Sequence, residues 1–470
     1  MAVTSLDDRL NAIGRTQPSL SALLPKLERF IRESPDADLD RINALRWANE
    51  NGVDQHQALE LFLRASAAGV FDLQWVLMCP LCGLYVSTRG ALQQLTRHAT
   101  CAFCRRPVSI ALDDTVEVVF TVAAAVRKLQ PRALGTIEDV RKHFIAEFYA
   151  RALIPTPLHT QIANSMQISR WVPTGESTTL ELNLEPGPYV LCIPHLHAIA
   201  HLETSENGTS ELAFEVLDGQ IVGAAPLKPG PVKIVVRNRT PRPVLALWGS
   251  TAWTKTFDWT GASAKFAPQV SAKQLLTNQT FRELYRAEGV GTDGGMQLRS
   301  LAILFTDLTA STELYERVGD LKALDLVRRH FEVLQGVIAA EHGAVVKTIG
   351  DAVMASFAEP DRALAAAAAM HRQMAMLGAS EELTLKIGVH VGSCVAIESN
   401  QQLDFFGRTV NVAARVQAKA GAGDVVITRE VLDHPSAREV AKTQFTSSSE
   451  ERVHLKGIEG EVAVHRLRVS

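Results

Sequence analysis

Four of the six cysteines stand in two closely spaced pairs, and this pattern constrains the fold more than any other feature of the sequence. The pairs are Cys79 with Cys82 and Cys101 with Cys104, in the spacing C-x2-C-x18-C-x2-C. Two residues between cysteines allow a tight turn to aim both sulfurs at one ion, and two such turns complete a tetrahedral shell. In a reducing cytosol the spacing favours one structural zinc per chain over disulfides. We therefore expect a zinc ribbon over residues 77–110; a metal-free or redox-active pair of turns is the alternative.

Net charge and hydropathy argue against attachment to DNA by net charge and against a membrane-spanning segment. The 470 residues carry 48 Lys and Arg against 51 Asp and Glu, a formal net charge of −3, so net charge does not favour attachment to DNA or a membrane. Arginines flank the ribbon and allow nucleic-acid binding, although a solvated surface explains them better. No apolar run reaches the roughly 18 residues that span a bilayer, and residues 1–8 lack the bases of a signal peptide. We expect a cytoplasmic protein with no membrane segment.

The segment before the ribbon has the pattern of paired helices. Residues 42–51 end at Gly52, and Asp54 is placed to cap a second helix that runs through Leu63. A β-rich stretch, residues 69–73, follows. This order resembles a winged-helix unit over residues 1–76, a fold that binds DNA in some proteins and other proteins elsewhere.

The middle of the chain has the texture of strands. Residues 171–260 hold short β-rich runs separated by Gly, Pro and Asn, which predicts a β-sandwich-like domain after a mixed α/β connector at 111–170. Within it, His195 and His197 would share a face if they lay on a strand, with His201 nearby. We weigh a metal site there against ordinary packing or surface histidines and favour the latter. Residues 261–297 are predicted to be a linker helix and a glycine-rich hinge.

The last third alternates β and α patterns and carries two candidate metal-binding acids. The apolar strand at residues 301–305 leads directly to Asp307, and a hairpin over residues 344–357 turns at Gly350 and Asp351. Packed strands would hold the two carboxylates rigidly, and such a pair suits a hard divalent ion that also binds phosphate. The alternative is two ordinary turn aspartates.

Three motifs in this region resemble the catalytic domain of class III nucleotidyl cyclases. They are residues 305–308, 347–351 and 404–415, in the order and spacing of that family. The resemblance implies an α+β, ferredoxin-like cyclase domain over residues 298–470, and thus a phosphorus-oxygen lyase of cyclic nucleotide signalling. The N-terminal half is similar to an uncharacterised segment that precedes some bacterial cyclase domains, through residues 73–80 and the second cysteine pair.

The resemblance assigns the metal site. Asp307, with Leu308 beside it, and Asp351 would bind two Mg²⁺ or Mn²⁺ ions per active site. One ion would lower the pKa of the ribose 3′-hydroxyl and the other would bind the triphosphate. Ala310 stands where many relatives have Gly in the loop that cradles the triphosphate, so nucleotide affinity or metal geometry is expected to differ.

The resemblance also assigns the remaining catalytic residues. Asn411 would orient the ribose, and Arg415, four residues later on the same helix face, would stabilise the charge of the transition state. Lys456 is similar to a family lysine that contacts phosphate. In the family the metal aspartates and the other groups come from opposite subunits. We therefore expect a head-to-tail homodimer with two equivalent sites and an inactive monomer.

The choice of base falls to Lys347 and Asp404. An ammonium can donate to adenine N1 and a carboxylate can accept from the adenine amino group, whereas guanine presents the opposite polarity. Family members that use GTP usually have Glu at the lysine position. The pair therefore predicts conversion of ATP to 3′,5′-cyclic AMP and pyrophosphate. We further expect the N-terminal half to regulate this activity, with a protein or a small molecule as the candidate regulator. The alternatives are a guanylyl or relaxed cyclase, and a DNA- or partner-binding regulator with weak cyclase activity.

Overall fold

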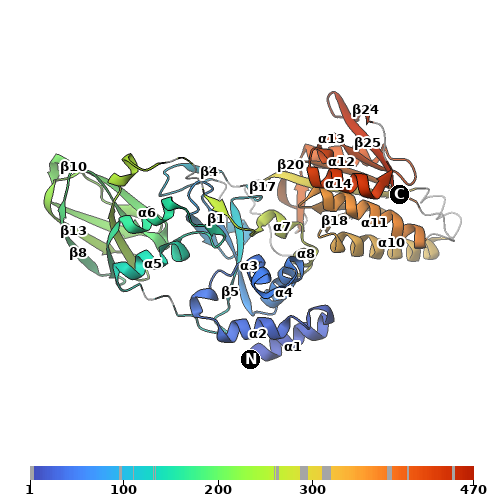
Figure 1. Cartoon of the computed structure of the whole chain (residues 1–470). Helices are drawn as coiled ribbons and strands as arrows, with labels where there is room; N and C mark the ends of the chain where they lie inside the picture. Colours follow the sequence, from blue (N-terminus) through green and yellow to red (C-terminus); the bar gives the residue numbers. More distant parts are fainter. Residues whose placement is uncertain are drawn as a thin grey trace.

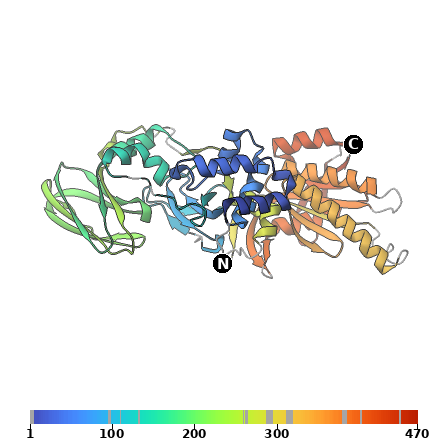
Figure 2. The ribbon, with the colours of Figure 1, turned by 90° about the horizontal axis from the view of Figure 1, so that it is seen from below.

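The computed structural model describes residues 5–469 except 95–97, 110, 131, 133, 259, 261–263, 286–294, 310–318, 378–383, 400–401 and 447–449. Within these residues three bodies lie in a row (Figure 1). We call them the sandwich (166–250), the N-terminal body (5–122 with 265–285) and the C-terminal body (295–469); the N-terminal body is in the middle, as Figure 2 shows from below. In the described part of the chain, no helix is both long and apolar enough to cross a membrane.

Two helices of the N-terminal body begin and end at the predicted residues. Asn43 caps α3 (Ala44–Asn51), which ends at Gly52 with φ +60°. Asp54 caps α4 (Gln55–Ala67) by accepting from two backbone N–H groups. These local predictions are confirmed, while the winged-helix interpretation stays a prediction. The other helices here are α1 (Leu6–Thr16), α2 (Leu24–Glu33), α7 (Ala272–Leu276) and α8 (Gln279–Leu284).

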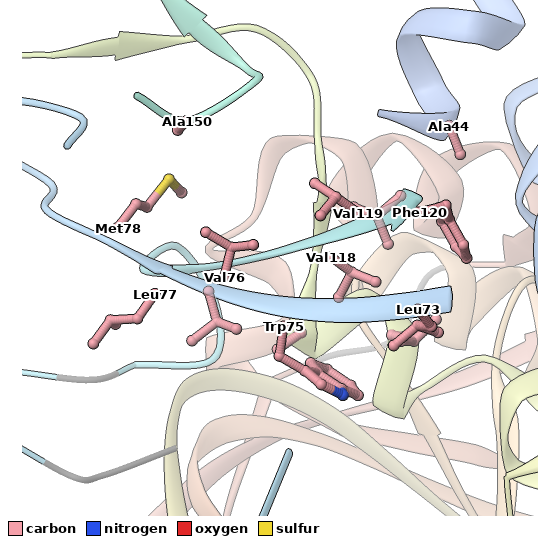
Figure 3. Close-up of a cluster of buried hydrophobic side chains, with 14 of the residues drawn as sticks. Ala44, Leu73, Trp75, Val76, Leu77, Met78, Val118, Val119, Phe120 and Ala150 are labelled. Carbon is pink, nitrogen blue, oxygen red and sulfur yellow. The ribbon is translucent and has the colours of Figure 1, made fainter. Parts of the chain in front are cut away.

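A four-stranded sheet forms the centre of this body, in the order β16-β5-β1-β2. Trp75 and Val76 of β1 and Val118 and Phe120 of β5 belong to its buried core (Figure 3). The strands are β1 (Phe71–Met78), β2 (Tyr85–Arg89), β5 (Val116–Val122) and β16 (Val270–Ser271). Short strands β3 (His98–Thr100) and β4 (Pro107–Ser109) pair beside the cysteines.

Part of the segment expected to be a linker belongs to this core. Val270 of β16 pairs with Val118, and Phe281 of α8 is buried with its ring centroid 5.9 Å from that of Trp75. The apolar side chains of α7 and α8 bury themselves on the sheet, so residues 270–284 are not a free connector. Residues 289–294 of the expected hinge lie outside the described residues.

The sandwich consists of two four-stranded sheets with one shared core. Their orders are β10-β9-β14-β7 and β12-β11-β13-β8, and Leu191, Phe214 and Trp248 are among the side chains buried between them. Helices α5 (Ile137–Phe148) and α6 (Pro157–Ser165) lie at the end that faces the N-terminal body (Figure 1). The strands are β7 (Met166–Val172), β8 (Ser177–Leu184), β9 (Pro188–Ile193), β10 (Ala198–Thr209), β11 (Glu211–Leu217), β12 (Gln220–Val222), β13 (Gly230–Asn238) and β14 (Val244–Ser250). A separate pair, β6 (Leu153–Ile154) and β15 (Lys265–Phe266), lies outside these sheets.

His195 and His197 do not lie on a strand, so the condition for a shared strand face is not met. Pro194 begins a short 3₁₀ helix, η4 (Pro194–Leu196), and His197 follows it with φ +51°. Proline at the first position favours such a turn because its ring fixes φ and it has no N–H to give to a strand ladder. Strand β10 begins only at Ala198, so the two histidines do not share a strand face.

The C-terminal body is a mixed sheet with helices on both faces. The sheet order is β18-β19-β17-β20-β22-β25-β23, with β21 paired to β20 and β24 to β25. Helices α10, α11 and α14 share a core with one face, and α12 packs on β20 and β17. The elements are β17 (Met296–Leu308), α10 (Asp320–Ala340), β18 (Ala344–Ile349), β19 (Ala352–Phe357), α11 (Pro360–Leu377), β20 (Leu385–Ser399), β21 (Gln402–Phe406), α12 (Arg408–Gln417), β22 (Val425–Thr428), α13 (Arg429–Leu432), α14 (Pro435–Gln444), β23 (Phe445–Thr446), β24 (Glu450–His454) and β25 (Glu461–Val469).

Candidate active site

The two candidate metal-binding aspartates lie at the ends of neighbouring strands. Asp307 is the penultimate residue of β17, and Asp351 follows Gly350, whose φ of +63° makes the tight turn between β18 and β19. Thr306 Oγ1 accepts a hydrogen bond from the backbone N–H of Val353 at 3.1 Å, which ties the end of β17 to this hairpin. The sheet therefore holds the two acids in one place.

The electrostatics of this pair fit a bound cation. Burial, and then the negative charge of Asp351, raise the pKa of Asp307, although Lys386 and Gln417 act in the opposite direction. Asp351 Oδ2 is buried, and among the described residues it has no hydrogen-bond partner. Two interacting carboxylates, one of them with an unsatisfied buried oxygen, suit a hard divalent ion. The Leu308 side chain is buried and has no donor atom, so only its main-chain carbonyl can act as a ligand. Ala310 lies outside the described residues.

Lys347 and Asp404 form an ion pair between strands that are not neighbours in the sheet. Lys347 Nζ lies 2.6 Å from Asp404 Oδ2, although β18 and β21 share no ladder. The other carboxylate oxygen accepts from the backbone N–H of Phe405 at 2.8 Å, which fixes its orientation. The pair thus presents an ammonium and a carboxylate side by side. The Lys347 side chain is 40% exposed and that of Asp404 is 15% exposed.

Asn411 and Arg415 lie on one exposed face of α12, whose opposite face buries Val412 and Val416. Asn411 also lines a shallow cavity of about 570 Å³ together with Arg408 and residues 457–459. Lys456 lies in the turn before this lining, between β24 and β25, rather than on a strand. The tertiary structure therefore places the Lys456 turn beside Asn411.

Within one chain, the candidate site residues form separate groups. Asp307 lies with Asp351, and Lys347 with Asp404. Among the described residues, no hydrogen bond or ion pair joins the aspartates to Lys347, Asp404, Asn411 or Arg415.

Arg282 of α8 is a neighbour of the site that sequence reasoning missed. Its Nη2 donates to the carbonyls of Leu403 at 2.5 Å and Val346 at 3.4 Å, and its guanidinium lies 5.9 Å from the ring centroid of Phe405. Burial lowers the pKa of Arg282 to about 10. Leu403 and Val346 directly precede Asp404 and Lys347, so this arginine holds the two strands at their charged residues. An arginine in an expected linker carries no motif that reveals this contact.

The four paired cysteines converge on one point. Their sulfurs lie within 4.8 Å of one another, with 4.0 Å between Cys79 and Cys104 and 3.8 Å between Cys82 and Cys101, and all four are free thiols. Tetrahedral zinc with bonds of about 2.3 Å requires sulfurs about 3.8 Å apart. Each turn closes with a hydrogen bond from the residue after its second cysteine to the carbonyl of its first. The neighbouring thiols lower the pKa of Cys79 and raise that of Cys82, so the four thiols titrate as one interacting group.

The described residues place no acidic or cysteine partner around the three histidines that would complete a metal site. A ring nitrogen of His201 lies 3.2 Å from the carbonyl of Ala102, next to the cysteines. His195 and His197 instead line a cavity between the sandwich and the N-terminal body.

Two family models match the chain. Residues 9–283 match a family described as "Family of unknown function (DUF5939)", and residues 296–468 match the "Adenylate and Guanylate cyclase catalytic domain". The second match contains both aspartates, the Lys347–Asp404 pair and α12.

Curated relatives match over about a third of this chain. An adenylate cyclase of Streptomyces coelicolor is 30% identical over 160 residues, 34% of this chain and 39% of the relative. An uncharacterized protein of Mycobacterium tuberculosis is 30% identical over 176 residues, 37% of this chain and 44% of the relative. The chain thus spans less than half the length of these relatives.

Solved structures match over a similar share. The adenylyl cyclase CyaB from P. aeruginosa is 22% identical with a TM-score of 0.33, covering 37% of this chain and 96% of that chain. The guanylate cyclase domain of RhGC from Catenaria anguillulae is 19% identical with a TM-score of 0.33, covering 37% and 98%. These solved structures thus include an adenylyl cyclase and a guanylate cyclase domain.

Proposed function

Because the chain belongs to the family of unknown function DUF5939, which covers more than half of it, and ends in a cyclase catalytic domain, we propose that it is a regulated adenylyl cyclase. It converts ATP to 3′,5′-cyclic AMP and pyrophosphate. The observation that carries the choice of ATP is the Lys347–Asp404 pair at 2.6 Å. A lysine donor and a carboxylate acceptor match adenine N1 and the adenine amino group, and they oppose guanine at both positions.

The metal chemistry rests on Asp307, the main chain of Leu308 and Asp351. Two Mg²⁺ or Mn²⁺ ions bound there would supply Lewis-acid activation of the ribose 3′-hydroxyl and neutralise charge on the triphosphate. The unsatisfied oxygen of Asp351 and the raised pKa of Asp307 support this assignment.

The exposed polar residues complete the substrate site. Asn411 orients the ribose, Arg415 stabilises charge on the transferring phosphoryl group and Lys456 contacts phosphate. The position of the Lys456 turn beside the cavity lined by Asn411 supports a shared role.

A second copy of the chain completes each site. In support, Ile349 and Phe406, each two residues from Lys347 or Asp404, leave 54% and 67% of their surface exposed. Apolar side chains beside charged substrate-binding groups fit a surface that a partner covers. The head-to-tail homodimer would bring the aspartates of one subunit to the base-recognising pair of the other.

Two assays on the purified full chain test this proposal. The ratio of kcat/KM for ATP to that for GTP should favour ATP, and Asp404→Asn should lower it about tenfold or more, because one charged hydrogen bond is lost. Asp433→Asn, at an exposed position, is the control. A preference for GTP, or an unchanged ratio in the Asp404 variant, would refute the assignment of the base.

Complementation tests the dimer. Asp307→Asn and Arg415→Ala should each be inactive alone, whereas a mixture should recover activity because one of the two sites of a mixed dimer is intact. No recovery, with both variants dimeric by analytical ultracentrifugation, would contradict opposite-subunit sites.

Regulation by the N-terminal half passes through α8. On one side Phe281 packs on Trp75, and on the other Arg282 contacts the residues before Lys347 and Asp404. Arg282→Met should therefore change KM and the ratio of ATP to GTP turnover. Arg299→Gln, which removes an exposed ion pair to Asp114 at the same junction, should not. Equal effects of the two variants would show that α8 has no special role.

The four cysteines bind one zinc ion that stabilises the N-terminal body. A complete cysteine shell leaves no open coordination position, so the ion is structural. The sulfur separations support this assignment.

A further inference from the structure

A cavity of about 530 Å³ lies between the N-terminal body and the sandwich, far along the chain from the catalytic motifs. The N-terminal body contributes residues on both sides of Asp38 and Leu39, namely Asp36, Ala37, Asp40 and Arg41, together with Tyr85. The sandwich contributes Trp171, His195 and Arg242. Ligand pockets of proteins commonly have volumes of about 300–1,000 Å³ and occur at domain junctions. Both the size and the position of this cavity fit a small-molecule site.

The charge of the cavity favours an anion. Its lining holds four arginines and three acids, and one of the acids, Asp36, already pairs at 2.5 Å with Arg127 outside the lining. Arg41 and Arg151 share Asp40, at 2.8 Å and 3.7 Å, and Arg132 pairs with Glu147 at 2.8 Å.

Arg242 is the loosest of these cations. It is 3.9 Å from Asp218, and the two side chains are 60% and 84% exposed. Its guanidinium is thus able to turn to a ligand at little cost, because an exposed ion pair contributes roughly 0–1 kcal/mol.

One wall of the cavity is aromatic. The ring centroids of Trp171 and His195 lie 5.8 Å apart, with 30° between the ring planes. Phe148 and His195 pack nearly perpendicular to each other, with ring centroids 5.4 Å apart. Trp171 is 42% exposed, yet its indole N–H donates to the carbonyl of Leu134 at 3.1 Å, which fixes the ring. The rings form a rigid ledge on which a planar group can stack.

Two further features of the lining are typical of ligand-binding sites. The hydroxyl of Tyr85 is buried in the lining and has no hydrogen-bond partner among the described residues. Arg41 and His197, both in the lining, adopt left-handed backbone conformations with φ +51°. Such conformations cost roughly 1–3 kcal/mol and concentrate at ligand clamps and active sites.

We propose that this cavity binds a small planar aromatic molecule with a single negative charge. The ring stacks on the Trp171–His195 ledge and the anionic group pairs with Arg242. Because both bodies contribute to the lining, the ligand holds the sandwich against the N-terminal body. That body reaches the catalytic strands through α8, so binding alters cyclase turnover; this last step alone rests on the proposed function.

Two sources share this chemistry: an aromatic carboxylate, and a cyclic nucleotide such as the proposed product. Calorimetry on the full chain, without ATP and without added Mg²⁺ or Mn²⁺, should use 1-naphthoate and cyclic AMP as probes. Adenosine, a ring without charge, and inorganic phosphate, a charge without a ring, should bind at least tenfold more weakly. Binding of 1-naphthoate alone assigns the site to carboxylates, and tighter binding of cyclic AMP assigns it to nucleotides.

Substitutions locate the binding. Trp171→Ala and Arg242→Gln, both at exposed positions, should weaken the Kd of the bound probe about tenfold or more, and Trp171→Phe should restore part of the loss. Arg237→Gln, which removes an exposed sandwich ion pair to Glu215, is the matched control. Failure of both probes to bind at about 1 mM, or equal affinity in the Trp171, Arg242 and control variants, would overturn the proposal. The binding assay does not depend on catalysis, so a protein that binds 1-naphthoate but makes no cyclic AMP would refute only the proposed function.

Discussion

Glu117 is a fully buried acid in the central sheet, and replacing it with glutamine should stabilise the protein at neutral and higher pH. Its Oε2 accepts from the backbone N–H of Arg151 at 3.2 Å, while Oε1 is buried without a hydrogen-bond partner among the described residues. Burial raises the pKa of Glu117 from 4.5 to about 7, against the opposing effect of Arg151 and Arg41. Glutamine keeps the shape and the acceptor but cannot ionise.

The pKa sets the size and the direction of the effect. Below pH 4.5 the carboxyl is protonated in both the folded and the unfolded state, so Glu117→Gln changes little. Between pH 4.5 and about 7 only the unfolded state ionises, and wild-type stability falls by about 1.4 kcal/mol per pH unit through this group. Above pH 7 the loss has reached about 3 kcal/mol, which the variant avoids.

Thermal unfolding of the full chain at pH 5, 6, 7 and 8 measures this difference. At pH 8 the transition of the N-terminal body should rise by about 6–12 °C in the variant, and at pH 5 by no more than about 2 °C. Glu206→Gln, at an exposed strand position, should show neither change. A variant that melts at or below the wild type at pH 8 would refute the raised pKa and the cost of ionising the buried carboxyl.

Three further predictions concern other parts of the molecule. Asp307→Asn should reduce cyclase turnover at least about a hundredfold while leaving the melting temperature nearly unchanged, because it removes a metal ligand and no packing; full activity would contradict the site. Cys82→Ser should release the zinc, seen as loss of one equivalent by elemental analysis, and lower the melting temperature of the N-terminal body; an unchanged metal content would exclude the cysteine site. Burial favours the protonated form of Asp424, but hydrogen bonds from Arg466 and Arg468 outweigh it and lower the pKa. Asp424→Asn should therefore cost about 3 kcal/mol in urea unfolding at pH 7, and the difference from wild type should shrink as the pH falls below 4; a pH-independent difference would contradict this.

Local features of the chain were readable from the sequence because they depend on neighbouring residues. Gly52 and Asp54 mark helix ends through turn geometry and capping within a few residues. The cysteine spacing predicts convergence of sulfurs because the two residues between each pair restrict the turn. An apolar run that leads directly to Asp307 likewise predicts an acid at the end of a buried strand, because the run and the acid are adjacent in the sequence.

Contacts between distant segments were decided only by the tertiary structure. The Lys347–Asp404 pair joins strands that are not neighbours, and the resemblance to a family, not the spacing, suggested it. Arg282 became a neighbour of that pair because α8 packs its apolar side on the N-terminal sheet.

The sequence by itself therefore determined the cyclase motifs, the paired cysteines and the helix ends at Gly52 and Asp54, because each of these is written in a short stretch of the chain. The structure alone decided that α8 joins the two halves and that Trp171, Arg41 and Arg242 meet in one cavity. No local pattern encodes those meetings, because they depend on which apolar surfaces bury one another when the whole chain packs.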